Sequence, residues 1–326
     1  MNTAERNRRK AKQRGARRTC RIGGITYLSF CLFILFLATG GCDIWDKDPA
    51  TCPAGIDVRF HSQSPCGENE LPSITGIRLY VFGADGTLVT VVNDDTAVLS
   101  ADYVKRVYLP RNGIYTTLAW VGLNMQYCEI EAVTVGTTTC DDVLLHLRRA
   151  AEQAVPTDGM CIYFGGGAAV DLATMPPCDG GIFAEVRVNI LEVTNRVTVE
   201  IDGVSAEYDY EVAIESANGM MTIDGACAPD DMVWYTPVSQ TVDGVLESRF
   251  TLLRLDSDIE SVLVVRDRAD GTEVYRAALL DELLLLNPFI DLACNHDFHI
   301  LLKVRGSLVV EARVNNWLVH SYETDL

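Results

Sequence analysis

The segment Cys294-Asn-His-Asp-Phe-His299 holds the densest group of side chains that could bind a metal ion. Imidazole, thiolate and carboxylate groups are the usual ligands of zinc and related metals. The surrounding pattern predicts a strand, however, and residues three apart on a strand point to opposite faces. His296 and His299 would then not reach one ion. We therefore expect no metal site, and interpret the segment as a disulfide cysteine followed by polar strand-edge residues.

Other motifs that could do chemistry are incomplete. Gly165-Gly-Gly167 is not followed by Lys-Ser or Lys-Thr, so we interpret it as a loop and not as a phosphate site. Asp94-Asp95 and Asp256-Ser-Asp258 lack the length and glycine placement of a calcium loop. Trp120 and Trp317 could stack on a sugar, but each lies in an alternating segment that predicts a core position.

Catalytic signatures are missing as well. The chain has no GxSxG or HExxH motif, and its five histidines are scattered. Acidic residues are numerous enough that a pair suited to glycoside hydrolysis cannot be rejected by counting. We expect a protein that is not an enzyme and that needs no cofactor, with a secreted hydrolase as the least favoured alternative.

Cys42 is the residue with the clearest chemical role. A basic stretch ending at Arg21 is followed by the apolar run Ile25–Leu37 and then by Ala38-Thr-Gly-Gly-Cys42. This order is typical of a secretory signal, and the run is short for a membrane span of about 20 residues. The ending resembles a bacterial lipobox, in which a peptidase cuts before the cysteine and its thiol carries diacylglycerol. The alternative is a plain signal peptide, with Cys42 forming a disulfide.

Charge divides the chain at the same place. The formal net charge is −18, but nine of the 27 basic residues and only one of the 45 acidic residues lie in residues 1–41. The remaining 285 residues therefore hold 18 basic and 44 acidic side chains, a formal charge of −26. Nucleic-acid binding needs clustered Lys and Arg, so we exclude nucleic acid as a partner.

The cysteines outside the leader indicate an oxidising compartment. After Cys42 an even number remains, which in an exported chain is typical of disulfides. Neighbours in the sequence suggest the pairs 52–66, 128–140, 161–178 and 227–294, although eight cysteines allow about 105 pairings. The candidate disulfide cysteines are Cys52, Cys66, Cys128, Cys140, Cys161, Cys178, Cys227 and Cys294.

Short alternating segments fill the rest of the chain. Asp85-Gly86 and Asp270-Gly271 each separate two such segments, a strong hairpin signal. A short helix is expected at 141–151, and Leu279–Leu286 predicts one or two buried helical turns before Pro288. The expected strands are 56–60, 77–82, 88–92, 107–109, 114–120, 183–189, 196–201, 233–235, 248–255, 261–265, 274–275, 298–304 and 308–319.

Turn signals every 8–12 residues with little helix predict an all-β fold of two antiparallel, immunoglobulin-like β-sandwich domains in tandem. Residues 152–182 are rich in Gly and Pro and predict a long irregular connection with a domain boundary near 180. The expected organisation is a signal peptide at 1–41, a tether at 42–54, an N-terminal sandwich at 55–180 and a C-terminal sandwich at 181–326.

Four segments together resemble the fimbrial anchor lipoproteins of Bacteroidales, the FimB-type and minor-fimbrium anchoring subunits. They begin with Cys52-Pro53 through Ile56–Phe60, followed by Ile77–Gly86, which is similar to the family's "lyvFdadG" strand and turn. Tyr103-Val104 with Leu109–Trp120 resembles "lpxGxYtlvaW", and Ala312–Val319 resembles "ixinxWxv". Gly83 stands where the family has Asp, and the extra cysteines also depart from its pattern.

The resemblance implies that the two β-sandwich domains are transthyretin-like. It also implies a surface-exposed, lipid-anchored subunit in the outer membrane that attaches the fimbrium and limits fibre length. It also implies contact with fimbrillin or other fimbrial subunits by strand exchange or edge pairing, because an open sheet edge exposes unpaired backbone groups. The candidate elements are Gly55–His61 and Leu308–Leu326, although both could simply complete their own domains. The alternative function is a surface adhesin or fimbrial tip subunit that binds a host glycan or protein.

Overall fold

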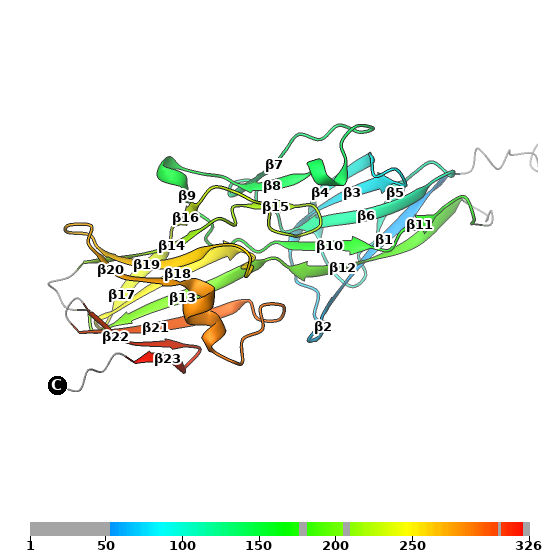
Figure 1. The fold of residues 1–326 in the computed structure, drawn as a ribbon. Coiled ribbons are helices and arrows are strands. Elements are labelled where there is room, and N and C mark those ends of the chain that lie inside the picture. The colour runs from blue at the N-terminus through cyan, green and yellow to red at the C-terminus, as the bar shows by residue number, and fades with distance from the viewer. Residues whose placement is uncertain (1–52, 176–180, 205–208, 306–307, 322–326) are drawn as a thin grey trace, which may run out of the picture. The chain divides into compact units, whose positions relative to one another are not determined.

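The structure, a computed structural model, describes residues 53–175, 181–204, 209–305 and 308–321. Within these ranges the chain is almost entirely β, as predicted, and Figure 1 shows its strands β1 to β23. No helix in the described ranges is long and apolar enough to cross a membrane. The expected signal peptide, Cys42 and most of the expected tether lie outside the described residues, as do Cys52 and Cys178.

The first sheet has nine strands, ordered β2-β1-β12-β10-β6-β3-β4, with β5 on β1 and β11 on β6. All its neighbours are antiparallel except β1 and β12, which run parallel. Alternating side chains are buried, as in a sheet with one face on a core. The strands are β1 (Ala54–Ser64), β2 (Gly67–Asn69), β3 (Thr75–Gly83), β4 (Leu88–Val98), β5 (Lys105–Tyr108), β6 (Ile114–Val121), β10 (Tyr163–Gly167), β11 (Val170–Asp171) and β12 (Ile182–Glu192).

The predicted hairpin at Asp85-Gly86 is confirmed and joins β3 to β4. The amide and hydroxyl of Thr87 both donate hydrogen bonds to the Asp85 carboxylate, at 3.1 and 2.8 Å. Gly86 has a φ of 78°, a left-handed conformation that glycine adopts at no steric cost. The turn therefore forms where local chemistry alone predicts it.

Two further sheets enclose the main core of the second half. The six-stranded sheet has the order β17-β18-β13-β21-β22-β23, with β13 and β21 parallel, and the five-stranded sheet has the order β20-β19-β14-β16-β9. The strands of the six-stranded sheet are β13 (Thr194–Asp202), β17 (Val238–Val242), β18 (Val245–Leu253), β21 (Asp297–Arg305), β22 (Leu308–Val314) and β23 (Trp317–Ser321). The strands of the five-stranded sheet are β9 (Ala154–Val155), β14 (Tyr210–Ser216), β16 (Val233–Tyr235), β19 (Ser261–Asp267) and β20 (Glu273–Ala278).

The prediction of a helix at 141–151 is wrong. A 3-10 turn, η3 (Cys140–Asp142), leads instead into β8 (Leu144–Leu147), and a second turn, η4 (Ala151–Gln153), follows. β8 pairs with β7 (Cys128–Ile130) and β15 (Met220–Thr222) in a three-stranded sheet. Leu145 and Leu147 are buried, so the apolar residues follow the two-residue period of a strand.

The prediction of an irregular connection at 152–182 is also wrong, because the middle of this segment forms the strand β10. Gly165 and Gly167 lie in β10, between β6 and β12. A Cβ atom on Gly165 would stand 2.2 Å from the carbonyl oxygen of Asn189, and one on Gly167 would stand 2.5 Å from Val186. The glycines therefore permit close packing in the interior of a sheet, and the sequence pattern that suggested a loop reflects this crowding.

β12 passes through Val193 directly into β13, so one continuous stretch of chain supplies a strand to the first sheet and a strand to the six-stranded sheet (Figure 1). Hydrogen bonding thus extends the first sheet to Glu192. The described residues carry two core clusters, of which one lies wholly within 56–190 and the other includes Tyr80 and Trp120 beside side chains of the second half. The separate domains at 55–180 and 181–326 stay a prediction.

The buried turns predicted at Leu279–Leu286 are confirmed. A π-helical turn, η5 (Leu279–Leu283), and a 3-10 turn, η6 (Leu284–Leu286), bury the side chains of Leu279, Leu280, Leu283 and Leu284. The predicted terminal hairpin also forms between β21 and β22. The segment expected as one strand at 308–319 is interrupted at Asn315-Asn316, where both residues have positive φ, and the chain turns back as β23.

Candidate functional site

The two segments expected to meet another subunit lie in different environments. β1 is paired along both sides within its own chain, with β12 on one side and with β5 and β2 on the other. β23, in the C-terminal segment, pairs only with β22 and is the outermost strand of the six-stranded sheet. Among the described residues, the C-terminal segment therefore offers an open backbone edge and the first strand does not.

The outermost strands differ in how they are protected. Beside β4, the amide of Leu88 donates to the carbonyl of Thr138 and its carbonyl accepts from Gly136, each at 2.8 Å. β20 carries Glu273 and Arg276, and charged side chains discourage edge-to-edge pairing. β17 and β23 contain no Asp, Glu, Lys or Arg. The outermost strands β9 and β15 also lack charged residues but are only two and three residues long, so β17 and β23 are the longer uncharged edges among the described strands.

A disulfide links Cys66 to Cys294 across 228 positions, with 6.0 Å between their Cα atoms. The expected pairs 52–66 and 227–294 are therefore wrong. The bond ties the turn between β1 and β2 to the segment that precedes β21. Folding brings these two segments together, although they lie far apart in the sequence. A cross-link that closes so long a loop stabilises a fold by about 2–4 kcal/mol.

Four of the other predicted cysteines are free thiols, namely Cys128, Cys140, Cys161 and Cys227, so the expected 128–140 bond is wrong too. Burial raises the pKa of Cys128 and of Cys227 to about 11. At neutral pH both are protonated and weakly reactive. The thiol of Cys161 lies 3.5 Å from the Glu192 carboxylate, and burial with that negative charge raises its pKa.

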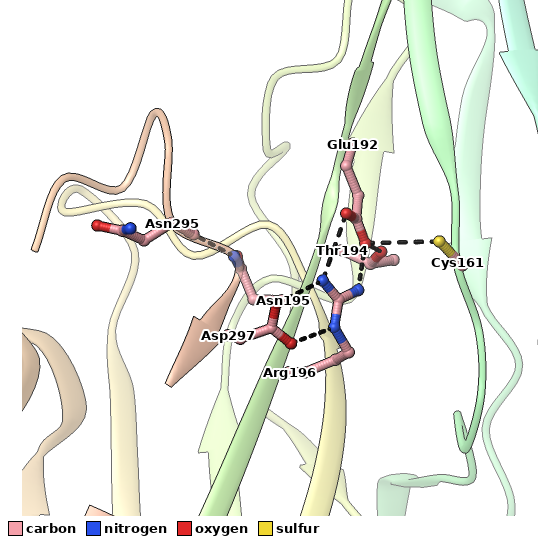
Figure 2. A network of polar contacts seen from close by, with 7 residues as sticks. All are labelled: Cys161, Glu192, Thr194, Asn195, Arg196, Asn295 and Asp297. Atoms are coloured by element: carbon pink, nitrogen blue, oxygen red, sulfur yellow. Dashed lines mark hydrogen bonds and ion pairs between the residues drawn. The ribbon is translucent and has the colours of Figure 1, made fainter. Parts of the chain in front are cut away.

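Arg196 organises the polar network where the first sheet continues into the second (Figure 2). Its guanidinium donates to both oxygens of Glu192, one at 3.4 Å, and to both oxygens of Asp297, at 2.5 and 3.1 Å. The hydroxyl of Thr194 donates to Glu192 at 2.8 Å. These hydrogen bonds raise the pKa of Arg196 and lower that of Asp297. The network therefore fastens the end of β12 to the start of β21.

A hollow of about 310 Å³ lies beside this network and the disulfide. Its walls come from β1, β2, β10, β12 and the segment before β21, and include Ser62, Asn69, Tyr163, Glu192, Arg254 and His296. Glu192 already accepts from Arg196 and Thr194. The arrangement holds strands together and contains no nucleophile paired with a base.

Most residues first considered as metal ligands are engaged in other interactions, but the buried Nδ1 of His296 has no hydrogen-bond partner among the described residues. His299 Nε2 lies 3.2 Å from the Glu200 carboxylate. Among the described residues, one group of three potential metal ligands is present, Cys66, Asp291 and Cys294, and its two sulfur atoms are joined in the disulfide. Asp94 pairs with Lys105 at 2.6 Å, which lowers the pKa of Asp94. Asp256 accepts a hydrogen bond from the amide of Asp258, as in an ordinary turn.

Trp120 and Trp317 have opposite environments. Trp120 is buried in β6, as predicted. Trp317 is 43% exposed, so its predicted core position is wrong, because the turn at Asn315-Asn316 starts a new strand at the sheet edge. Its ring meets Phe289, which is 77% exposed, at a centroid distance of 5.6 Å and an angle of 77°. The two positive-φ asparagines before Trp317 were the sequence signal for this turn.

Comparisons with known proteins agree with this architecture. The model of the family "fimbrillin-A associated anchor proteins Mfa1 and Mfa2" matches residues 49–323. The minor fimbrium anchoring subunit Mfa2 of Porphyromonas gingivalis is 32% identical over 288 residues, which cover 84% of this chain and 88% of the relative.

Solved structures give the same picture. The fimbrial anchor protein Mfa2 from Porphyromonas gingivalis has a TM-score of 0.74 at 31% identity and covers 83% of this chain and 100% of its own. A putative polysaccharide binding protein from Bacteroides thetaiotaomicron has a TM-score of 0.68 at 22% identity, over 83% of this chain and 98% of its own, a likeness of fold alone. The relatives are anchor and adhesin proteins, not enzymes.

Proposed function

This chain belongs to the family of fimbrillin-A associated anchor proteins Mfa1 and Mfa2, and on that basis we propose that it attaches a fimbrium to the outer membrane as a lipid-anchored subunit. The observation that carries the proposal is the 32% identity to an anchoring subunit over 84% of the chain. The anchored subunit ends the fibre at its base, and we propose that it thereby limits fibre length.

The membrane attachment is assigned to Cys42. The basic segment, the apolar run and the small residues before this cysteine support cleavage ahead of it and acylation of its thiol. Two or three acyl chains hold a protein firmly, because each buried methylene contributes about 0.8 kcal/mol. A body with a formal charge of −26 is repelled by an anionic membrane surface, so the lipid and the tether at 42–54 would carry the attachment.

The contact with the fibre is assigned to the open edge of β23. Among the described residues, this strand is the outermost of its sheet, and it carries no Asp, Glu, Lys or Arg. Leu318 is 46% exposed and can pack against a side chain of an added strand. Main-chain hydrogen bonds would supply affinity and the exposed side chains would supply specificity. The partner is fimbrillin or another fimbrial subunit, and the site of action is the cell surface.

The test is to delete the gene and restore it as wild type, Leu318→Lys or Val242→Lys. Val242 is 55% exposed on β17, the other long outermost strand without charged residues, and serves as the matched control. We expect the deletion strain and the Leu318→Lys strain to shed fimbriae into the medium, and the other two to keep them on the cell. A charge buried in a strand-addition interface lacks a partner, which weakens the contact about tenfold or more.

Two outcomes would contradict the assignment. Normal, attached fimbriae in the deletion strain would refute the anchoring function itself. Attached fimbriae with Leu318→Lys, but shed fimbriae with Val242→Lys, would move the contact from β23 to β17 and leave the anchoring function standing.

A further inference from the structure

Two aromatic side chains stand outside both core clusters, next to each other. Phe289 follows the buried helical turns η5 and η6, and Trp317 begins β23. Their rings are 77% and 43% exposed and meet edge to face at 5.6 Å. The pair adds little to the core, because Phe289 lies mostly in water and Trp317 is covered only in part.

The two rings form one side of a hollow of about 280 Å³ whose remaining wall is rich in asparagine. Asn287, Asn295, Asn315 and Asn316 line it together with Ile290. Asn315 also lines a second hollow of about 360 Å³, bounded by Arg196, Thr198, Asp297, Phe298 and His299. The shared asparagine makes the two hollows neighbours, with room for more than one small ring.

Several of the amides in the first hollow are available to a ligand. Asn315 accepts from the amide of His299 through Oδ1, and Asn295 accepts from the amide of Asp291, each at 2.8 Å. Within the described part of the chain, the Nδ2 groups of both residues donate to no protein acceptor, and the side chain of Asn316 makes no hydrogen bond. Three residues that line the hollow together with the aromatic pair thus have amide donors to spare.

The walls of the hollow are fixed before any ligand arrives. Asn287 is buried, donates to the carbonyl of Val314 at 2.9 Å and accepts from the amide of Phe289 at 3.0 Å. Asn315 also donates its own amide to the carbonyl of His299 at 2.8 Å. The turn that carries Trp317 and the loop that carries Phe289 are therefore tied to the same sheet, and a rigid site binds with less loss of entropy.

We propose that this hollow, lined by Phe289, Trp317, Asn295, Asn315 and Asn316, binds a neutral oligosaccharide. The C–H face of a pyranose ring packs on an aromatic ring, and its hydroxyl groups accept from and donate to side-chain amides. An apolar peptide side chain would cover the rings but leave the amide donors unsatisfied, which costs free energy.

The charges around the site favour a neutral sugar over an acidic one. Arg196 in the second hollow is paired with Asp297 and Glu192, and His299 is paired with Glu200. Arg196 is the single Lys or Arg among the residues that line the two hollows. A sialic acid or a phosphorylated sugar would therefore meet one guanidinium that is already neutralised, within a body of net negative charge.

The experiment uses the complete mature protein and four neutral probes: maltotetraose, mannotetraose, laminaritetraose and tetrameric N-acetyllactosamine. Saturation-transfer NMR detects contact, and calorimetry gives the dissociation constant. We expect at least one probe to bind, with its ring protons saturated most strongly. Trp317→Ala and Asn316→Gly should each weaken binding about tenfold or more. Glycine keeps the positive φ of position 316, so that variant removes only the amide.

Tyr108→Ala is the matched control, because this exposed tyrosine lies on β5, outside both hollows, and its removal should leave binding unchanged. Circular dichroism of each variant separates loss of binding from loss of fold. Absence of binding by all four probes at 10 mM (about the weakest useful affinity) overturns the proposal. So does binding that Trp317→Ala leaves intact, or capture of purified fimbrial subunits, instead of sugars, that depends on Trp317.

Discussion

At the scale of single residues, the best-supported structural role belongs to Arg196. It holds Glu192, whose side chain is nearly buried, and Asp297 in one network between β12, β13 and β21. Removing the guanidinium would leave the Glu192 carboxylate with only the hydroxyl of Thr194 and the thiol of Cys161. A poorly satisfied carboxylate in that position costs more than the loss of an exposed ion pair.

Arg196→Gln should therefore lower the free energy of unfolding at pH 7 by about 1–2 kcal/mol. Arg187→Gln is the control, since Arg187 is far more exposed and its pair with Glu185 lies at the surface, so its effect should stay within about 0.5 kcal/mol. Urea denaturation followed by circular dichroism measures both. Equal losses in the two variants would contradict the role of the network.

The same network predicts how the difference in free energy of unfolding between wild type and Arg196→Gln depends on pH. Hydrogen bonds from Arg196 lower the pKa of Asp297 below its ordinary 3.8. The folded state therefore binds fewer protons than the unfolded state, so the stabilisation is complete above about pH 4 and is lost as the pH falls through the lower, folded-state pKa. The difference in free energy of unfolding between wild type and Arg196→Gln should therefore decrease below pH 4. A difference in free energy of unfolding that stayed constant down to pH 2 would exclude this coupling between Asp297 protonation and stability.

At the scale of elements, local chemistry explains what the sequence could predict. The Asp85-Gly86 and Asp270-Gly271 hairpins form because their turn residues suit the backbone, and the leucines of 279–286 form buried turns. The strands β8 and β10 were not predicted, because their formation depends on sheet partners that lie far away in the sequence. Leu145 and Leu147 fit a helix as well as a strand until β15 is present, and Gly165 is explained only by the nearness of Asn189.

The disulfide is the clearest case of a feature beyond local prediction. Cys66 and Cys294 are 228 positions apart, and only the packing of the β1–β2 turn against the segment before β21 brings them together. The exposed site at Phe289 and Trp317 depends on the same segment, since Phe289, Asn295 and Cys294 lie close in sequence. Its residues were visible in the sequence, but their common location was not.

Peptide mapping without reduction should recover a peptide that contains Cys66 linked to one that contains Cys294. Cys66→Ser and Cys294→Ser should each lower the free energy of unfolding by about 2–4 kcal/mol, and the double variant should lose no more than either alone. Cys140→Ser, at a free and partly exposed thiol, is the control and should change stability by less than about 1 kcal/mol. Recovery of a 52–66 or 227–294 linkage would contradict the structure.

At the scale of the whole molecule, the chain combines a leader suited to export, an acidic body and an all-β fold shared with fimbrial anchor proteins. The net charge of −18 averages a basic leader and a body of −26, which have separate functions. In the proposed function, the leader directs the chain to the membrane and the body faces the fibre. In this account the covalent lipid on Cys42 is the physical link between the two environments.

The most direct test of anchoring compares where the fimbriae are found in strains that express wild type or Cys42→Ala in place of the native gene. Cells and medium are separated, and the major fimbrial subunit is quantified in each. We predict that wild type keeps fimbriae on the cell, and that Cys42→Ala releases both itself and the fimbriae into the medium. Fimbriae that remain on cells whose anchor protein carries no lipid would contradict the account.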